Sequence, residues 1–164
     1  MDYLWSPWRF QYVSTPSQPG QECLFCYAFS QNRDRELLVA HRAQHCAVIL
    51  NRFPYTAGHM MIAPYRHLAF LEDASLSELH DLVTLAALCQ KALRLAYRPE
   101  GLNLGMNLGR CAGAGVADHF HLHVLPRWTG DSNFLTVVGE TRTLPEDLHT
   151  TYDKIRQFLD GDSH

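Results

Sequence analysis

Positive charge is sparse and dispersed in this chain of 164 residues. It holds 14 Lys and Arg against 17 Asp and Glu, and its formal net charge is −3 with the 10 histidines neutral. The basic residues do not gather into a run. Proteins that bind nucleic acid regardless of its sequence present a basic face or run to the phosphates. The composition argues against that class, and we expect no nucleic-acid partner.

Long apolar segments are lacking as well. No stretch approaches the roughly 20 apolar residues that a transmembrane helix needs. Residues 1–5 have neither the basic start nor the apolar centre of a secretory signal peptide. We therefore expect a cytoplasmic protein with no membrane partner.

Cysteine is scarce: the chain has only five cysteines, an odd number. Cys46 and Cys89 lie in apolar runs, where buried thiols are common, so a disulfide framework is not expected. Cys23 and Cys26 form a Cys-x-x-Cys pair that could by itself be redox-active, structural or incidental. No βαβ pattern surrounds the pair, which argues against a thioredoxin-like role.

The chain has no evident internal repeat, and its length is that of one ordinary domain. Residues 1–22 are rich in aromatic residues, Pro, Ser and Gln, which predicts an irregular N-terminal arm. Residues 23–164 are expected to form a single domain.

Short apolar runs and two amphipathic segments predict the secondary structure. Strands are expected over residues 37–40, 46–50, 59–63, 102–107 and 119–125, with a further short apolar run at 134–138. Ser75 and Glu78 have capping-box spacing at the start of a long helix that ends near Tyr97, before Pro99. A final helix is expected over 145–159, with Pro in its first turn. This order predicts an α+β fold, an antiparallel sheet with a long helix and a C-terminal helix packed on it.

The segment 119–126, His-Phe-His-Leu-His-Val-Leu-Pro, is the most informative in the chain. Alternate residues of a β-strand project from opposite faces. His119, His121 and His123 are therefore expected on one face of a strand, anchored by the apolar residues between them. A row of imidazoles on a rigid support is typical of a catalytic site.

This His-φ-His-φ-His-φ-φ pattern, in which φ is apolar, resembles the signature of the histidine triad family of nucleotidyl hydrolases and transferases. Residues 58–64, 102–109 and 126–134 are similar to other segments of that family. Residues 4–9 and the segment after the triad resemble its diadenosine tetraphosphate phosphorylase branch. The resemblance spans most of the chain and implies a HIT-like fold and a homodimer.

The resemblance also implies catalytic roles. His121 would be the nucleophile that attacks the α-phosphorus of a nucleotide and forms a nucleotidyl-imidazole. Its neutral ring needs an acceptor for the second nitrogen, because that hydrogen bond fixes the tautomer. His123 would contact the phosphate, and His59 would support the row that begins at His119. A buried histidine with a purely structural role is an equal alternative for His59.

Nucleotide contacts are implied at several polar and small residues. Asn51 is similar to a residue that binds the ribose, although it could instead be a turn residue. Asn107 would contact a phosphate. The backbone amides of Gly113, Ala114 and Gly115 could converge on phosphate oxygens, whereas a plain flexible turn is the alternative. The fragile histidine triad hydrolases carry Gln at the position of Gly115, so a side-chain contact of theirs is missing here.

Three residues near the triad are weaker candidates. Trp128 could stack on a base, but an aromatic residue at a strand end is more often part of a core or an interface. Arg110 and Arg127 could pair with a polyphosphate chain, or they could be ordinary solvated residues.

The family resemblance extends to a metal site. Some bacterial members, and the related galactose-1-phosphate uridylyltransferase, bind zinc through positions that match Cys23, Cys26, His67 and His119. Two thiolates and two imidazoles complete a tetrahedral zinc shell. Such a closed site would be structural, and would tie the start of the domain to the catalytic segment.

We therefore expect an enzyme that cleaves dinucleoside polyphosphates, with diadenosine tetraphosphate as the leading substrate. Inorganic phosphate as the second acceptor would give ADP and ATP, and water would give AMP and ATP. The resemblance of residues 4–9 and of the segment after the triad to the phosphorylase branch favours phosphorolysis. A hydrolase or a nucleoside phosphoramidase of the same family is an alternative, as is a zinc-stabilised nucleotide-binding module without turnover.

Overall fold

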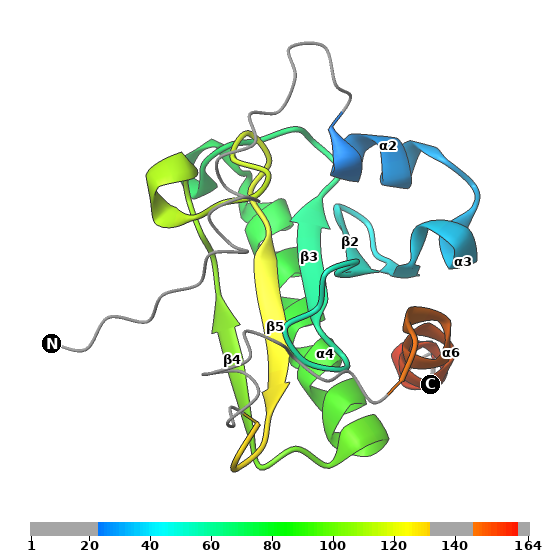
Figure 1. The fold of residues 1–164 in the computed structure, drawn as a ribbon. Helices are drawn as coiled ribbons and strands as arrows, with labels where there is room; N and C mark the ends of the chain where they lie inside the picture. The colour runs from blue at the N-terminus through cyan, green and yellow to red at the C-terminus, as the bar shows by residue number, and fades with distance from the viewer. Residues whose placement is uncertain (1–22, 132–145, 161–164) are drawn as a thin grey trace, which may run out of the picture.

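The computed structural model describes residues 23–131 and 146–160 (Figure 1). The expected arm 1–22 and the apolar run 134–138 lie outside the described residues. The helices are α2 (Leu24–Ser30), α3 (Asp34–Leu37), α4 (Leu76–Tyr97) and α6 (Leu148–Leu159), with short 3₁₀ turns η1 (Leu71–Asp73) and η2 (Arg110–Ala112). The strands are β1 (Val39–Arg42), β2 (Cys46–Leu50), β3 (Met60–Pro64), β4 (Gly101–Gly105) and β5 (Leu122–Arg127).

The five strands form one antiparallel sheet in the order β1-β2-β3-β5-β4. His123 of β5 lies between Met61 of β3 and Gly105 of β4. The strand that carries the end of the triad is therefore paired on both sides, which makes it a rigid support. The predicted α+β class is confirmed.

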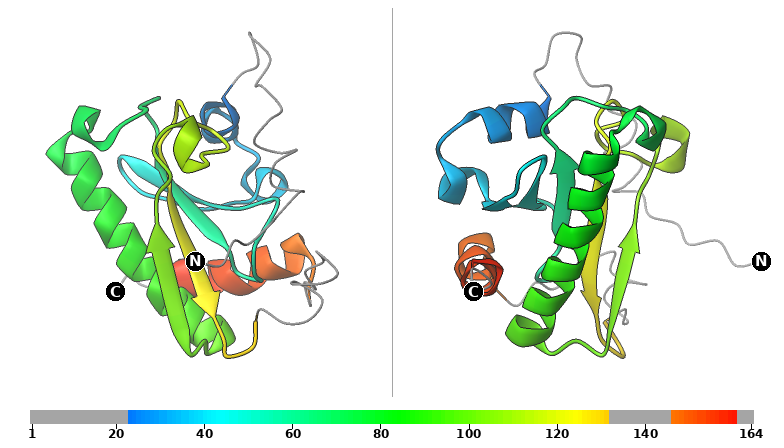
Figure 2. Two further views of the ribbon diagram at one scale, coloured as in Figure 1. Left: turned by 60° about the vertical axis from the view of Figure 1, so that its left-hand side comes forward. Right: turned by 180° about the vertical axis from the view of Figure 1, so that it is seen from behind.

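Helices cover both faces of the sheet. Figure 2 shows α4 crossing one face, and the core there buries Leu50, Ile62 and Val124 under α4 and α6. Side chains of the opposite strand face, including Ile49 and Met61, pack with α2 in a second core. The apolar side of the triad segment, through Phe120 and Val124, belongs to the first core.

The two predicted helices are confirmed, with one change of boundary. Ser75 caps α4, and its hydroxyl and the Glu78 carboxylate form the predicted capping box. The final helix begins at Leu148 rather than at residue 145. The Asp147 carboxylate accepts hydrogen bonds from the amides of His149 and Thr150, which fixes the start there.

The strand boundaries differ from the prediction mainly at β1 and β5. β1 starts two residues later than expected, because α3 runs to Leu37 and Leu38 adopts a left-handed conformation with φ of 64°. β5 starts at Leu122 instead of residue 119. The Phe120 amide donates to the Leu68 carbonyl at 2.7 Å, outside the sheet. The prediction that all three histidines stand on one strand is therefore wrong, since His119 and His121 precede it.

No helix in the described parts of the chain combines the length and the apolar character needed to cross a membrane.

Candidate active site

A cavity of about 470 Å³ lies beside the start of β5. Among the predicted site residues, it is lined by His121, His123, Asn51, Asn107, Gly113 and Gly115. An apolar part of its wall is formed by Leu24, Phe25, Ile49, Met61 and Val116. The structure thus brings the middle and last histidines of the triad together with the predicted nucleotide contacts. A cavity with apolar walls and a few converging polar groups is the usual form of a small-molecule site.

His121 is buried, and its ring is held in one orientation. Its Nδ1–H donates to the backbone carbonyl of His119, with 3.0 Å between Nδ1 and the oxygen. Because a carbonyl can only accept, the proton of the neutral ring is on Nδ1 and the lone pair is on Nε2. Burial lowers the pKa of His121, although the bond to His119 opposes this shift. The ring is therefore kept neutral, and the lone pair on Nε2 could act as a nucleophile.

His59 and His123 form a second ordered pair. The Tyr55 amide donates to His59 Nδ1 at 3.2 Å, and His59 Nε2 lies 2.9 Å from His123 Nδ1. Since a backbone amide can only donate, neutral His59 carries its proton on Nε2 and gives it to His123. A neutral His123 then carries its own proton on Nε2. This arrangement suits His123 to donate a hydrogen bond to a phosphate.

Asn51 contacts the same loop. Its Nδ2 lies 3.4 Å from His59 Nδ1, and its Oδ1 accepts from the Phe53 amide at 2.9 Å. The second bond is typical of the turn role that the sequence left open. The residue lines the cavity as well, so a contact with a ribose remains compatible with its position.

The loop before the triad is a tight turn with glycine at both ends of η2. Gly109 and Gly113 have φ values of 82° and 89°, which favour glycine. Gly113 and Gly115 line the cavity, whereas Ala114 is buried between them. The amides of Gly113 and Ala114 donate to the carbonyls of Arg110 and Gly109 within the loop, at 2.9 and 3.4 Å, which favours the turn role for these two residues.

Trp128 and Arg127 do not line the cavity. β5 carries them to the far end of the sheet, where the Trp128 ring packs edge-on against Tyr97 at 6.4 Å between centroids. Arg127 donates to Asp131 and Asn103. Their placement favours the structural alternatives over stacking on a base or pairing with phosphate. Arg110 is exposed on η2 and is also not part of the wall.

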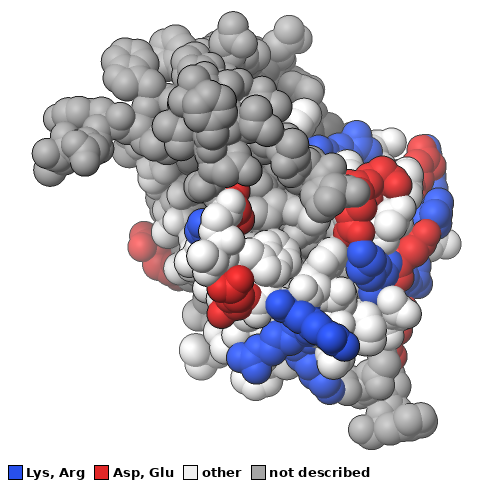
Figure 3. Space-filling model, turned by 60° about the horizontal axis from the view of Figure 1, so that its bottom comes forward, with Lys and Arg blue, Asp and Glu red and all other residues white. Residues whose placement is uncertain are grey.

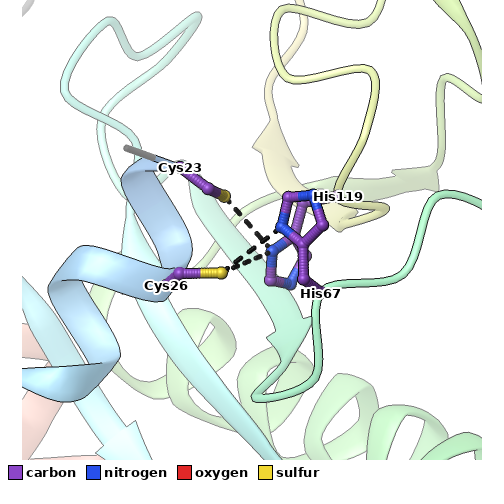
Figure 4. Close-up of side chains that lie close together, drawn as sticks. All are labelled: Cys23, Cys26, His67 and His119. Atoms are coloured by element: carbon purple, nitrogen blue, oxygen red, sulfur yellow. Dashed lines mark hydrogen bonds between the residues drawn. The ribbon is translucent and has the colours of Figure 1, made fainter. Parts of the chain in front are cut away.

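The four predicted metal ligands converge beside the cavity (Figure 4). Cys23 and Cys26 lie at the start of α2, His67 follows β3, and all four ligand atoms, including that of His119, lie within 4.8 Å of one another. His119 Nε2 donates to the Pro64 carbonyl at 2.9 Å, so Nδ1 is the nitrogen left for a metal. Nδ1 lies 3.3 Å from the Cys23 sulfur.

The donor set fits zinc. Two sulfur and two imidazole ligands, with one imidazole oriented by a backbone carbonyl, are typical of a closed tetrahedral site. Burial lowers the pKa of His119 to about 4, which keeps the ring in the neutral form that a metal requires.

Phe25 joins the two regions, a role that was not predicted from the sequence. It stands inside the Cys-x-x-Cys motif, and its ring centroid lies 5.1 Å from that of His119 and 4.9 Å from that of His121. Tyr55, whose ring lies 4.7 Å from that of His59, was also missed. The contacts of Phe25 join α2 to the triad segment, which no local pattern relates, whereas Tyr55 lies only four residues from His59. The position of Phe25 between two candidate ligands is the one signal that could have pointed to it.

Comparison with known proteins agrees with this geometry. The HIT domain family model matches residues 34–130. AP-4-A phosphorylase of Mycobacterium tuberculosis is 38% identical over 163 residues, which cover 90% of this chain and 79% of that protein. The chain belongs to the HIT family. The family assignment from the triad and its neighbouring motifs is confirmed.

Two further HIT relatives bear on the substrate and the metal. The bis(5'-nucleosyl)-tetraphosphatase [asymmetrical] of Schizosaccharomyces pombe is 32% identical over 93 residues, which cover 57% of this chain and 50% of that protein. A zinc-bound histidine triad family protein of Mycobacterium smegmatis has a similar structure, with a TM-score of 0.68 and 25% identity. That match covers 84% of this chain and 93% of the other. The HIT-like fold is therefore confirmed.

Proposed function

We propose that this protein is an enzyme that cleaves dinucleoside polyphosphates, with diadenosine tetraphosphate as the leading substrate, through a nucleotidyl-His121 intermediate. The observation that carries the proposal is the buried His121 ring, whose Nδ1–H is taken by the His119 carbonyl beside the cavity. The relatives named AP-4-A phosphorylase and bis(5'-nucleosyl)-tetraphosphatase support the substrate class.

The residues divide the reaction into two displacements. In the first, His121 Nε2 bonds to the α-phosphorus, and the bond between that phosphorus and the bridging oxygen breaks. The leaving ATP keeps the electron pair of that bond on its oxygen, and the N–H at His123 Nε2 donates a hydrogen bond to this oxygen. In the second, inorganic phosphate or water attacks the phosphorus, the bond to His121 breaks with its electron pair returning to Nε2, and the proton of an attacking water passes to the solvent. The released nucleotide is ADP with phosphate and AMP with water.

Phosphate is the proposed second acceptor, because the relative with 38% identity is named a phosphorylase. The test is product analysis of diadenosine tetraphosphate incubated with the protein, with and without inorganic phosphate. ADP and ATP that form only with phosphate are the expected result. AMP and ATP in both reactions would identify a hydrolase instead. Cleavage of nucleoside phosphoramidates alone would move the protein to the phosphoramidase class.

We also propose that Cys23, Cys26, His67 and His119 hold one structural zinc ion. The convergence of their ligand atoms and the zinc-bound relative support this. The metal would cross-link the start of α2 to the segment that carries the triad, and it would leave no open position for water. Metal analysis of the purified protein should find about one zinc per chain.

A homodimer is the proposed assembly. β4 is an edge strand, and most of its residues, among them Asn103 and Leu104, are exposed. An exposed edge is a surface on which a second copy can pair. Sedimentation analysis would test this, with a monomer as the contrary result. The cytoplasmic location and the single domain over 23–164 stay predictions.

A further inference from the structure

The cavity that holds His121 offers little positive charge to a highly anionic substrate. The rings of His121 and His123 are held by hydrogen bonds to neutral groups, and burial keeps the His121 ring uncharged. Every phosphate of a dinucleoside polyphosphate is ionised at neutral pH, whereas the chain has a net charge of −3. Arg52 is the only Lys or Arg among the described residues that line the cavity.

Most other cations of the described chain are already paired with carboxylates. These pairs are Arg33–Glu36, Arg35–Asp153, Arg42–Asp34, Arg66–Glu78, Arg127–Asp131, Lys154–Glu146 and Arg156–Asp160. Figure 3 shows such acidic and basic side chains interspersed on one face of the molecule. Charge neutralised in this way cannot attract a polyphosphate to the cavity.

Arg52 differs from these residues. It is exposed, and no hydrogen bond or ion pair joins it to another residue in the described ranges 23–131 and 146–160. The pKa of Glu36 is lowered first by its hydrogen bond from Arg33, and Arg52 makes a smaller contribution. Glu36 is thus held by another arginine, and the Arg52 guanidinium is available to an anion at the cavity wall.

Phe53, the next residue, adds an aromatic surface. It lines the same cavity, and its side chain is 69% exposed. Among the exposed large apolar side chains of the described residues, it is the most exposed aromatic one. The bond from its amide to Asn51 Oδ1 holds the turn that carries both side chains. Arg52 and Phe53, termed here the distal rim, contrast with the buried apolar wall around Phe25 and Met61.

We propose that the distal rim binds the leaving half of the substrate. Arg52 pairs with the phosphates beyond the one that His121 attacks, and Phe53 stacks on the second base. A charged hydrogen bond to phosphate and an aromatic stacking surface are the groups that a second nucleotide needs and a small leaving group does not. The rim would therefore select dinucleoside polyphosphates over short nucleotide esters. This inference rests on the proposed function.

The test compares two substrates in wild type and Arg52→Gln. With diadenosine tetraphosphate, kcat/KM should fall by about 10- to 100-fold, because the lost interaction is made only by the polyphosphate. With the 4-nitrophenyl ester of AMP it should stay within about twofold. Arg52→Lys should recover part of the loss, since the charge remains. Arg94→Gln, an exposed arginine of α4 away from the cavity, is the matched control and should change neither value.

A binding measurement separates this inference from the proposed function. In a His121→Asn background, adding Arg52→Gln should weaken binding of diadenosine tetraphosphate about tenfold and leave the affinity for AMP unchanged. Equal losses for both ligands, or no loss for either, would overturn the distal rim. If wild type cleaves no dinucleoside polyphosphate, the proposed reaction fails, whereas the binding comparison still decides the role of Arg52.

Discussion

The cavity and the Cys/His cluster lie side by side and use histidine in opposite ways. At His119 the backbone carbonyl of Pro64 takes Nε2–H, and Nδ1 is left for a metal. At His121 the carbonyl of His119 takes Nδ1–H, and Nε2 is left for a phosphorus atom. Burial lowers the pKa of both rings. The choice between metal ligand and nucleophile is therefore set by which nitrogen a nearby carbonyl occupies.

The two regions are also mechanically linked. The carbonyl that orients His121 belongs to His119, and the Phe25 ring contacts both imidazoles. α2 carries Phe25 between the two cysteines. A substitution in the Cys/His cluster should therefore affect the cavity, but less than a substitution of His121 itself.

The largest expected effect comes from removing the nucleophile. His121→Asn keeps a polar side chain of smaller size but cannot form the phosphorus–nitrogen bond. Turnover of diadenosine tetraphosphate should fall by at least about 10³-fold, because the intermediate is lost. The affinity for AMP, measured by calorimetry, should remain within about tenfold, or roughly 1.4 kcal/mol. Zinc content should not change, since the cluster keeps its four ligands.

The control for this variant is His149→Asn, an exposed histidine of α6 remote from both regions, which should behave as wild type. Near-normal turnover by His121→Asn would remove His121 from the nucleophile role. Loss of zinc together with activity would instead show that His121 supports the cluster, and the division between the two regions would be wrong.

A smaller effect is expected from breaking the metal cluster. Cys26→Ser removes one of the two thiolate ligands, so the zinc content should fall well below one per chain. The loss of a cross-link between α2 and His119 should lower the melting temperature by about 5 °C, or about 2 kcal/mol for a chain of this size. Affinity for AMP should weaken only a few-fold, through Phe25.

Cys111→Ser, at an exposed cysteine outside the cluster, is the matched control and should keep both zinc and stability. A Cys26→Ser protein with an unchanged melting temperature would discard the structural metal. A loss of AMP affinity well beyond about tenfold would show that the cavity depends on the metal more than its geometry indicates.

The triad segment shows which structural features could be predicted from the sequence. Alternation of His and apolar residues correctly placed Phe120 and Val124 in the core and His121 at the cavity, because strand periodicity extends into the segment before β5. It did not locate the strand boundary. The Phe120 amide bonds to Leu68, a contact over 52 positions that no local pattern contains.

The site residues also divide into those that could be predicted from the sequence and those that could not. Residues tied to a family motif, such as His67 and the cysteines, converged as expected. Three residues were not predicted. Phe25 contacts the separate triad segment, Tyr55 packs on His59 in its own turn, and the proposed role of Arg52 depends on the charges of its neighbours. Trp128 was named for base stacking with a core or interface position as the alternative. The six residues of β5 carry it to the far end of the sheet, where it packs against Tyr97.

The smallest expected effect concerns how the two regions are positioned. On the cluster side, Arg66 stands next to His67 and pairs with Glu78 of α4, whose carboxylate also accepts from Ser75. The hydrogen bond from Arg66 is the main cause that lowers the pKa of Glu78 to about 2. The cavity side, in contrast, is positioned by packing and by bonds among neutral groups. Only the cluster side should therefore depend on an ionised carboxylate.

The sign of the pH dependence follows from this shift. Because the folded pKa of Glu78 lies below its ordinary value of 4.5, its contribution to stability is complete above pH 4.5 and is lost as the pH falls toward 2. Glu78→Gln should lower the melting temperature at pH 7 by about 2–4 °C, roughly 1 kcal/mol. The difference in melting temperature between the Glu78→Gln protein and its parent should disappear as the pH falls below 4.5.

The measurement is thermal unfolding of the metal-free Cys26→Ser protein, with and without Glu78→Gln. This parent holds no zinc that acid could release. Glu72→Gln, on the exposed turn η1, should leave the curve unchanged. A difference that stays constant from pH 7 to pH 2 would mean that Glu78 acts through packing, and that charge positions neither region.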